Sequence, residues 1–171
     1  MYQEYNMSMR DTEKIRKFKS ADLADVRELI YRTIDACYSG IYCAEAVKFF
    51  KDWHHDRKIL KNAKEGYTIV VEKDNQIIGT GTIVGDEIMR VFVDPAFHKC
   101  GVGKLIMRRL ERKAVSAGIE VVKLDASLPS KRFYELLGYV LLEETFVEVE
   151  NNEKLDYYKM KKALVRKKLR S

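Results

Sequence analysis

The segment from His98 to Lys104 has the residue types of a phosphate-binding turn, with glycines at 101 and 103 and lysines at both sides of them. It lies between a β-rich segment that ends at Asp94 and a run of apolar residues at helical spacing that starts at Val102. Glycines let consecutive backbone N–H groups converge on one anion, and the N-terminus of a helix adds a favourable potential there. The turn is therefore predicted to bind a phosphorylated ligand.

Residue spacing distinguishes between the nucleotide-binding motifs that use such a turn. A P-loop requires glycine where this chain has His98, and serine or threonine where it has Leu105. A dinucleotide-binding fingerprint requires a small residue where this chain has Ile106, and its strand opens a βαβ unit instead of following a hairpin meander. Neither motif fits the sequence.

The turn and the strand before it match a different signature. Val-Phe-Val-Asp-Pro at 91–95, followed by the His-x-x-Gly-x-Gly pattern at 98–103, closely resembles the acetyl-CoA signature of the GNAT superfamily of N-acetyltransferases. His98 stands where that family usually has arginine or glutamine. A second segment, residues 127–139, is similar to the family's Asn-x-x-Ala-x-x-Phe-Tyr-x-x-x-Gly-Phe element, with Ser127 in place of the asparagine.

The resemblance covers about residues 14–162. It implies an α+β (mixed α/β) fold, with a twisted, mostly antiparallel sheet of six to seven strands flanked by about four helices. It also implies an N-acetyltransferase with acetyl-CoA as co-substrate and no metal, in which the acetyl group moves directly to an amine within a ternary complex. The residues implied to contact acetyl-CoA are Val91, Phe92, Val93, His98, Lys99, Cys100, Gly101, Val102, Gly103, Lys104, Ser127, Lys131 and Tyr134.

Acetyl transfer to an amine requires a deprotonated nitrogen, stabilisation of a developing oxyanion and a proton for the leaving thiolate. Tyr134 occupies the general-acid position of the family, and a phenol of pKa about 10 can protonate the thiolate of a thiol of pKa about 8.5. By the same resemblance, a backbone N–H of Phe92 or Val93 stabilises the oxyanion. Cys100 has no role as a nucleophile in such a direct transfer.

Glu87 is the predicted general base, because several family members carry a glutamate at this distance before the turn. On a regular strand, Glu87, Met89, Val91 and Val93 share one face. A carboxyl group among such apolar neighbours has a raised pKa, which suits a base that works near neutral pH.

The acceptor pocket of this family is enclosed by the first two helices and the last strands. Three aromatic residues, Tyr38, Tyr42 and Trp53, flank the break between those helices and are predicted to stack on the substrate or its cation, with packing of the helix pair as the alternative. Near the end of the sheet, Glu144, Glu148 and Glu150 attract an amine or belong to a polar loop. A small amine is the first choice of acceptor, and a peptide or protein amine is the second.

The rest of the chain alternates between strand and helix patterns that must position these residues. The first half predicts a strand at 14–18, helices at 23–36 and 44–60, and a meander with strands at 67–71, 77–84 and 87–94. The second half predicts a helix from the turn to a glycine cap at Gly118, a strand at 121–126, a short helix up to Leu137, and strands at 139–145 and 155–160.

Length and composition indicate one globular domain. The 171 residues are 46% hydrophobic and 34% charged. We expect a flexible N-terminus at 1–13, a single acetyltransferase domain at 14–162 and a basic tail at 163–171. No stretch approaches the roughly 20 apolar residues that span a membrane. Together with three unpatterned cysteines, this predicts a cytoplasmic protein without a membrane partner.

Two functions from other classes remain open. A non-catalytic acetyl-CoA sensor would share the turn, and a nucleic-acid-binding protein would use the net charge of +6 and the basic tail. A nucleic-acid role is disfavoured because no aromatic residue follows Tyr158. Consecutive residues of a helix point about 100° apart, so His54 and His55 do not predict a metal site. A sheet edge near the C-terminus favours pairing into a homodimer.

Overall fold

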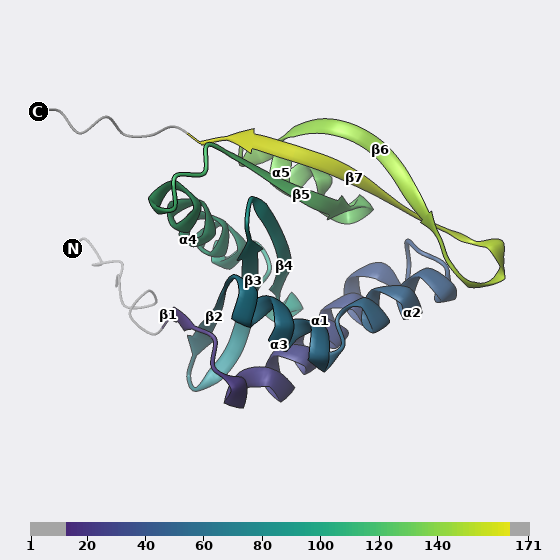
Figure 1. Cartoon of the computed structure of the whole chain (residues 1–171). Coiled ribbons are helices and arrows are strands. Elements are labelled where there is room, and N and C mark those ends of the chain that lie inside the picture. The colour runs from purple at the N-terminus through teal and green to yellow at the C-terminus, as the bar shows by residue number, and fades with distance from the viewer. Residues whose placement is uncertain (1–12, 165–171) are drawn as a thin grey trace, which may run out of the picture.

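A computed structural model describes residues 13–164, which form a seven-stranded sheet with helices on both faces (Figure 1). The strand order is β1-β2-β3-β4-β5-β7-β6, and every neighbouring pair is antiparallel except β4 and β5. This confirms the predicted α+β fold. The expectations for the ends of the chain, a flexible N-terminus and a basic tail, fall almost entirely outside the described residues.

The elements follow the predicted order. The first half contains β1 (Glu13–Lys17), α1 (Leu23–Tyr38), α2 (Ala44–Trp53), α3 (Asp56–Glu65), β2 (Tyr67–Lys73), β3 (Gln76–Val84) and β4 (Glu87–Val93). The second half contains α4 (Val102–Ser116), β5 (Val121–Ser127), α5 (Lys131–Leu136), β6 (Val140–Glu148) and β7 (Lys154–Ala163). Short 3-10 turns lie at Ser20–Asp22, Pro95–Phe97, Leu128–Ser130 and Glu150–Asn152. None of the described helices is long and apolar enough to cross a membrane.

The single helix predicted over 44–60 is wrong, because the structure divides it into α2 and α3. The helix ends at His54, whose backbone leaves the helical region with φ −105° and ψ 32°. The imidazole of His54 is buried and packs edge-on against the ring of Phe92 in β4, with 5.1 Å between ring centroids. A contact with a distant strand therefore interrupts a segment whose local pattern is helical throughout.

Two apolar cores lie on opposite faces of the sheet. Along β2, Ile69 and Val71 belong to the core covered by α4, whereas Val70 belongs to the core covered by α1, α2 and α3. Alternate residues of a strand point to opposite faces, so these two cores are separated by the sheet. Gly79 and Gly81 of β3 lie directly beneath Ile106, and a Cβ atom at either position would collide with that side chain. The two glycines thus let α4 pack closely on the sheet and set the position of the turn before it.

Candidate active site

The centre of the sheet is open between β4 and β5. Within the described residues these parallel strands pair only through Glu87 and Lys123, where the Lys123 N–H also donates to the Asp86 carbonyl at 2.9 Å. Beyond that point the strands diverge (Figure 1). The edge of β4 that faces β5 therefore has no strand partner from residue 88 to residue 93, and its backbone groups are available to a ligand.

The predicted phosphate-binding turn leads from the end of β4 into α4. Its backbone is left-handed at Lys99 (φ 60°) and at Gly101 (φ 88°), directly before the helix starts at Val102. Alternation of left-handed and right-handed residues is the geometry that turns consecutive N–H groups toward one anion. His98, Lys99, Cys100 and Lys104 are exposed around the turn. The turn thus has the shape that its sequence predicts.

The side chains of α1 hold the start of the turn in place. Arg32 pairs with Asp94 at 2.5 Å, and the Asp94 carboxylate also accepts a hydrogen bond from the Ala96 N–H at 2.9 Å. The Val93 carbonyl oxygen is 2.8 Å from the His98 Nε2 and 3.3 Å from the Thr33 hydroxyl, which donates mainly to the Leu29 carbonyl at 2.8 Å. Arg32 and Thr33 were not predicted, because they lie about sixty residues before their partners and belong to no motif.

The two sequence motifs meet at Gly103. A Cβ atom on Gly103 would lie 3.0 Å from Cζ of Phe133 and 3.7 Å from Cγ2 of Val93. The first turn of α4 therefore packs against the ring of Phe133 in α5 and against the end of β4. Because the neighbouring residue is Tyr134, this contact brings the predicted general acid to the same region as the phosphate-binding turn.

A cluster of hydroxyl groups lies where β5 ends. The Oγ atoms of Ser127 and Ser130 are 2.6 Å apart, and the hydroxyl of Tyr38 from α1 lies beside both serines. Ser127 is buried, so its hydroxyl is held within the protein beside Ser130. Ser130 and the hydroxyl role of Tyr38 were not predicted. The Ser-x-x-Ser spacing on a strand end followed by a turn was the available signal for the first of these.

Tyr134 is buried next to this cluster. Its ring packs edge-on against Phe133 and Tyr139, with 5.0 and 5.7 Å between ring centroids. Burial raises the pKa of the Tyr134 hydroxyl above its ordinary value, and the neighbouring Tyr38 phenol raises it further. The phenol therefore keeps its proton throughout the neutral and moderately alkaline range, as a general acid must.

The predicted environment of Glu87 is wrong, because β4 is not a regular strand. Its pairing with β3 shifts register between Thr80 and Thr82, and the bulged residue Arg90 has φ 54°. Before the bulge, Glu87 and Met89 share the face of the sheet that points away from α4. After it, Val91 and Val93 pack against the α4 core on the opposite face. Glu87 itself is exposed, so it lacks the apolar surroundings expected from a regular strand.

The three aromatic residues predicted to stack on a substrate lie in two different environments. Tyr38 and Tyr42 are buried and pack with Phe50 in a cluster whose ring centroids are 4.7 to 5.6 Å apart. Trp53 is exposed, stacks on Phe49 and lies under the Lys58 ammonium. The two tyrosines thus pack the helix pair, and stacking of any of the three residues on a substrate stays a prediction.

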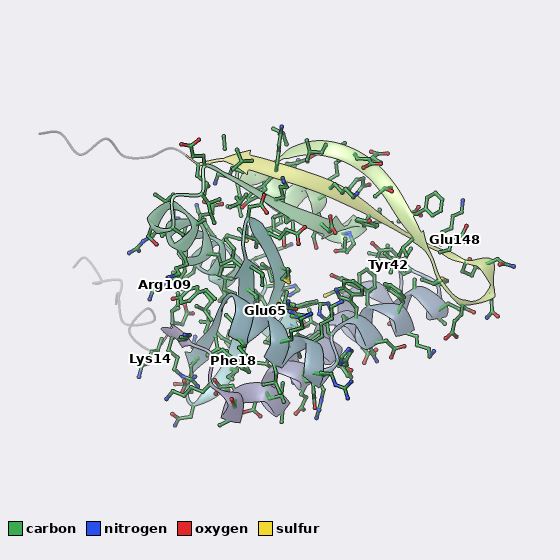
Figure 2. All side chains as sticks on the ribbon, in the orientation of Figure 1. Lys14, Phe18, Tyr42, Glu65, Arg109 and Glu148 are labelled. Atoms are coloured by element: carbon green, nitrogen blue, oxygen red, sulfur yellow. The ribbon has the colours of Figure 1, made fainter. Side chains whose placement is uncertain are left out.

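Tyr42 connects three elements through its hydroxyl. It accepts a hydrogen bond from the Leu128 N–H at 2.8 Å and donates one to the Asp156 carbonyl at 2.9 Å. Figure 2 shows its side chain between α2 and the β6–β7 pair. The hydroxyl thereby fixes the end of β5 relative to β6 and β7. These segments enclose a pocket of about 270 Å³, which is lined by Leu128, Glu144, Thr145, Phe146, Asp156, Tyr157 and Tyr158.

We expect Tyr42→Phe to destabilise the protein by about 1–3 kcal/mol, because the Leu128 N–H and the Asp156 carbonyl both lose their partner. Urea unfolding followed by circular dichroism measures this change. Tyr31→Phe is the matched control, since no hydrogen bond joins its hydroxyl to any described residue. Equal unfolding midpoints for the two variants would contradict the bridging role of Tyr42.

Charged residues near the site are mostly paired. Lys131 lies 3.7 Å from Glu144 and 4.0 Å from Glu135, and its ammonium is 4.5 Å above the ring of Tyr158. Glu150 pairs with Lys48. Among residues 13–164, no three histidine, cysteine, aspartate or glutamate side chains are grouped so that they could hold a metal ion.

Comparison with known proteins agrees with this geometry. Residues 27–139 match the family model described as Acetyltransferase (GNAT) family. A putative acetyltransferase of Bacillus subtilis is 34% identical over 83 residues, which are 46% of this chain and 56% of that protein. The chain spans little more than half the length of the curated relatives that it matches.

Two solved structures share the fold at low sequence identity. A GCN5-related N-acetyltransferase from Rhodopseudomonas palustris superimposes with a TM-score of 0.82 at 22% identity, over 90% of this chain and 96% of that one. The PaiA N-acetyltransferase from Thermoplasma acidophilum, solved in complex with coenzyme A, gives a TM-score of 0.72 at 19% identity, over 89% and 99% of the two chains. Since the family model covers well over half of the sequence, including both motifs that meet at Gly103, the chain belongs to the acetyltransferase (GNAT) family.

Proposed function

We propose that this protein is an N-acetyltransferase that moves the acetyl group of acetyl-CoA to the amine of a small molecule. The observation that carries the proposal is the contact of Gly103 with Phe133, because it joins the phosphate-binding turn to the helix that bears Tyr134. The relative from Thermoplasma acidophilum, which was solved with coenzyme A, and the acetyltransferase family supply further support.

The phosphate-binding turn and the open edge of β4 fit two parts of acetyl-CoA, its pyrophosphate and its pantetheine chain. The left-handed backbone at Gly101 and the free space next to it leave the N–H groups of the turn open to the phosphates. The unpaired edge of β4 offers backbone groups of residues 91–93 to the extended pantetheine chain and the acetyl carbonyl. His98, Lys99, Cys100 and Lys104 are exposed around the turn, and Val102 contributes its backbone at the start of α4. Ser127 ends β5 and Lys131 starts α5, and we propose that both contact the cofactor.

The proposed transfer is a direct displacement. The amine nitrogen bonds to the thioester carbonyl carbon, a backbone N–H of Phe92 or Val93 stabilises the oxyanion, and the carbon–sulfur bond then breaks with its electron pair on sulfur. Tyr134 donates its phenolic proton to that sulfur, and the surplus proton on nitrogen passes to a base. The products are an acetylated amine and free coenzyme A thiol.

Glu87 is the proposed base and acts through water, because its carboxylate is exposed. General bases contribute about 10²–10⁴-fold when they hold the reacting proton directly. The contribution of an exposed base that acts through water should be smaller than this range. We therefore expect Glu87→Gln to lower kcat/KM about 10-fold at pH 7. Hydroxide replaces the lost base at higher pH, so the deficit shrinks toward pH 9.

A pH profile of thiol release measures this effect. Asp86→Asn is the control, since Asp86 is the adjacent carboxylate and pairs with Lys123 at 2.9 Å. A Glu87→Gln profile that overlays the wild-type profile at every pH would show that another group takes the proton.

The proposed function is tested by calorimetric titration with acetyl-CoA, followed by a thiol-release assay with a panel of small amines and amine-terminated peptides. We expect binding and release with at least one small amine. Absence of any heat or thermal shift with acetyl-CoA would disprove the proposal. Release with peptides alone would assign the second class of acceptor, and tight binding without release would indicate a sensor.

A further inference from the structure

Arg90 combines two unfavourable features in the open part of β4. It is the bulged residue of the strand, with φ 54°, a conformation that costs energy for any side chain larger than glycine. Its side chain is also buried, with 6% of the residue exposed. Strained residues and buried charges both reduce stability, and they persist where function requires them.

The guanidinium of Arg90 has no anionic partner among the described residues. Its Nε donates to the Nδ1 of His54 at 3.2 Å, and its Nη1 lies 3.7 Å from the sulfur of Met89. Its Nη2 is buried and has no hydrogen-bond partner. None of the ion pairs within residues 13–164 includes Arg90.

The neighbours of Arg90 do not neutralise its charge. Burial lowers the pKa of His54 to about 3, so the imidazole is neutral and its Nδ1 accepts the hydrogen bond from Arg90 without balancing the charge. Burial lowers the pKa of Lys58, and the nearby charge of Arg90 lowers it further. The charged group that acts on the same region is therefore a second cation, and burial of Arg90 is not offset by a carboxylate among the described residues.

The phosphates of acetyl-CoA do not supply the missing anion. They are proposed to bind at the N-terminus of α4, which packs on the sheet face occupied by Val91 and Val93. Arg90 contacts His54, whose ring packs on Phe92, and Phe92 belongs to the core on the other face. The sheet thus separates Arg90 from the phosphate-binding turn.

We propose that Arg90 binds an anionic group, a carboxylate or a phosphate, on the acceptor amine. This inference rests on the proposed function and names the class of acceptor. Nη1 and Nη2 of a guanidinium present two parallel N–H donors that match the oxygens of such a group. Nη1 has the Met89 sulfur as its partner at 3.7 Å, a weak acceptor on a flexible side chain that an anion would replace. The acceptor amine then lies along the open edge of β4, beside the proposed acetyl position.

Matched acceptors test this inference on the intact protein. Phenylalanine is compared with phenethylamine to examine a carboxylate, and O-phosphoethanolamine is compared with ethanolamine to examine a phosphate. We expect one anionic acceptor to be acetylated with a kcat/KM about 10²-fold or more above that of its neutral partner, the scale of a buried charge-assisted contact. Which pair shows the preference identifies the anion.

Two variants separate recognition from folding. Arg90→Met removes the charge but keeps a side chain of similar length, and Arg112→Met removes an exposed arginine of α4 as the control. We expect Arg90→Met to abolish the preference for the anionic acceptor and to leave the neutral acceptor within about threefold. The ligand-free Arg90→Met protein should unfold at a temperature equal to or above that of the wild type, because an uncompensated buried charge is lost.

The outcomes are distinguishable. Thiol release at equal rates from both members of each pair, or a loss in Arg90→Met that affects anionic and neutral acceptors equally, overturns this inference and leaves the transferase proposal intact. No release with any acceptor, anionic or neutral, overturns the proposed function. A lower unfolding temperature of Arg90→Met, with the preference retained, assigns Arg90 a structural role instead.

Discussion

Replacing Tyr134 with phenylalanine is expected to lower kcat for acetyl transfer by about 10²–10³-fold, within the range that general acids contribute. The ring contacts with Phe133 and Tyr139 remain in the variant, so the helix α5 keeps its position. Only the proton donor is lost, and the dissociation constant for acetyl-CoA should change less than about threefold, equivalent to less than about 0.7 kcal/mol. Stopped-flow thiol release and calorimetric titration measure the two quantities.

Tyr139→Phe is the matched control for this experiment. It also removes one hydroxyl from the same aromatic cluster, but that hydroxyl donates to Glu111 at 3.0 Å on the α4 side. We expect this variant to lose stability while its kcat stays close to that of the wild type. A Tyr134→Phe variant that retains full kcat would exclude Tyr134 as the general acid.

Burial of Tyr134 also determines the pH dependence that is expected. Its pKa is raised in the folded state, so the folded protein holds this proton more tightly than the unfolded chain does. The resulting stabilisation is complete below the ordinary tyrosine pKa of about 10 and is lost as the pH rises above it, because the unfolded chain then ionises first. The alkaline limb of the activity profile should therefore lie above pH 10 unless unfolding intervenes.

Replacing Gly101 with valine is expected to weaken acetyl-CoA binding by about 10- to 100-fold. A Cβ atom at this position would meet nothing within 4 Å, so no collision causes the loss. The cause is the backbone, because φ is 88° and a β-branched residue pays about 1–3 kcal/mol to adopt such a conformation. The turn of the variant relaxes to another conformation, and acetyl-CoA must restore the left-handed one when it binds. Each 1.4 kcal/mol of that cost weakens the affinity about tenfold.

Gly40→Val is the control for this prediction, since Gly40 is equally open to solvent and lies outside the left-handed region. Calorimetric titration of both variants with acetyl-CoA measures the difference. An unchanged affinity in Gly101→Val would show that the turn does not bind the phosphates through its backbone.

The local patterns of the chain predicted most elements correctly, since each depends on a signal contained within a few residues. Asp74 and Asn75 have φ values of 50° and 63°, as their hairpin turn requires, and Gly118 ends α4 with φ 79°. The alternation of the meander and the helical spacing after Val102 also predicted β2, β3, β4 and α4. The error over 44–60 has a different origin, because the contact of His54 with Phe92 is not encoded within the helix.

The order of residue types by itself determined the turn at 98–104 and the helix after it, because glycine conformation and helical periodicity act over short distances. The place of Tyr134 near the turn depends on the contact between Gly103 and Phe133. Only the tertiary structure decided which side chains face the site. The bulge at Arg90 reversed the face expected for Val91 and Val93, and packing buried Tyr38 and Tyr42 while leaving Glu87 in solvent. Burial, register and charge pairing depend on contacts between distant segments, and no short pattern specifies them.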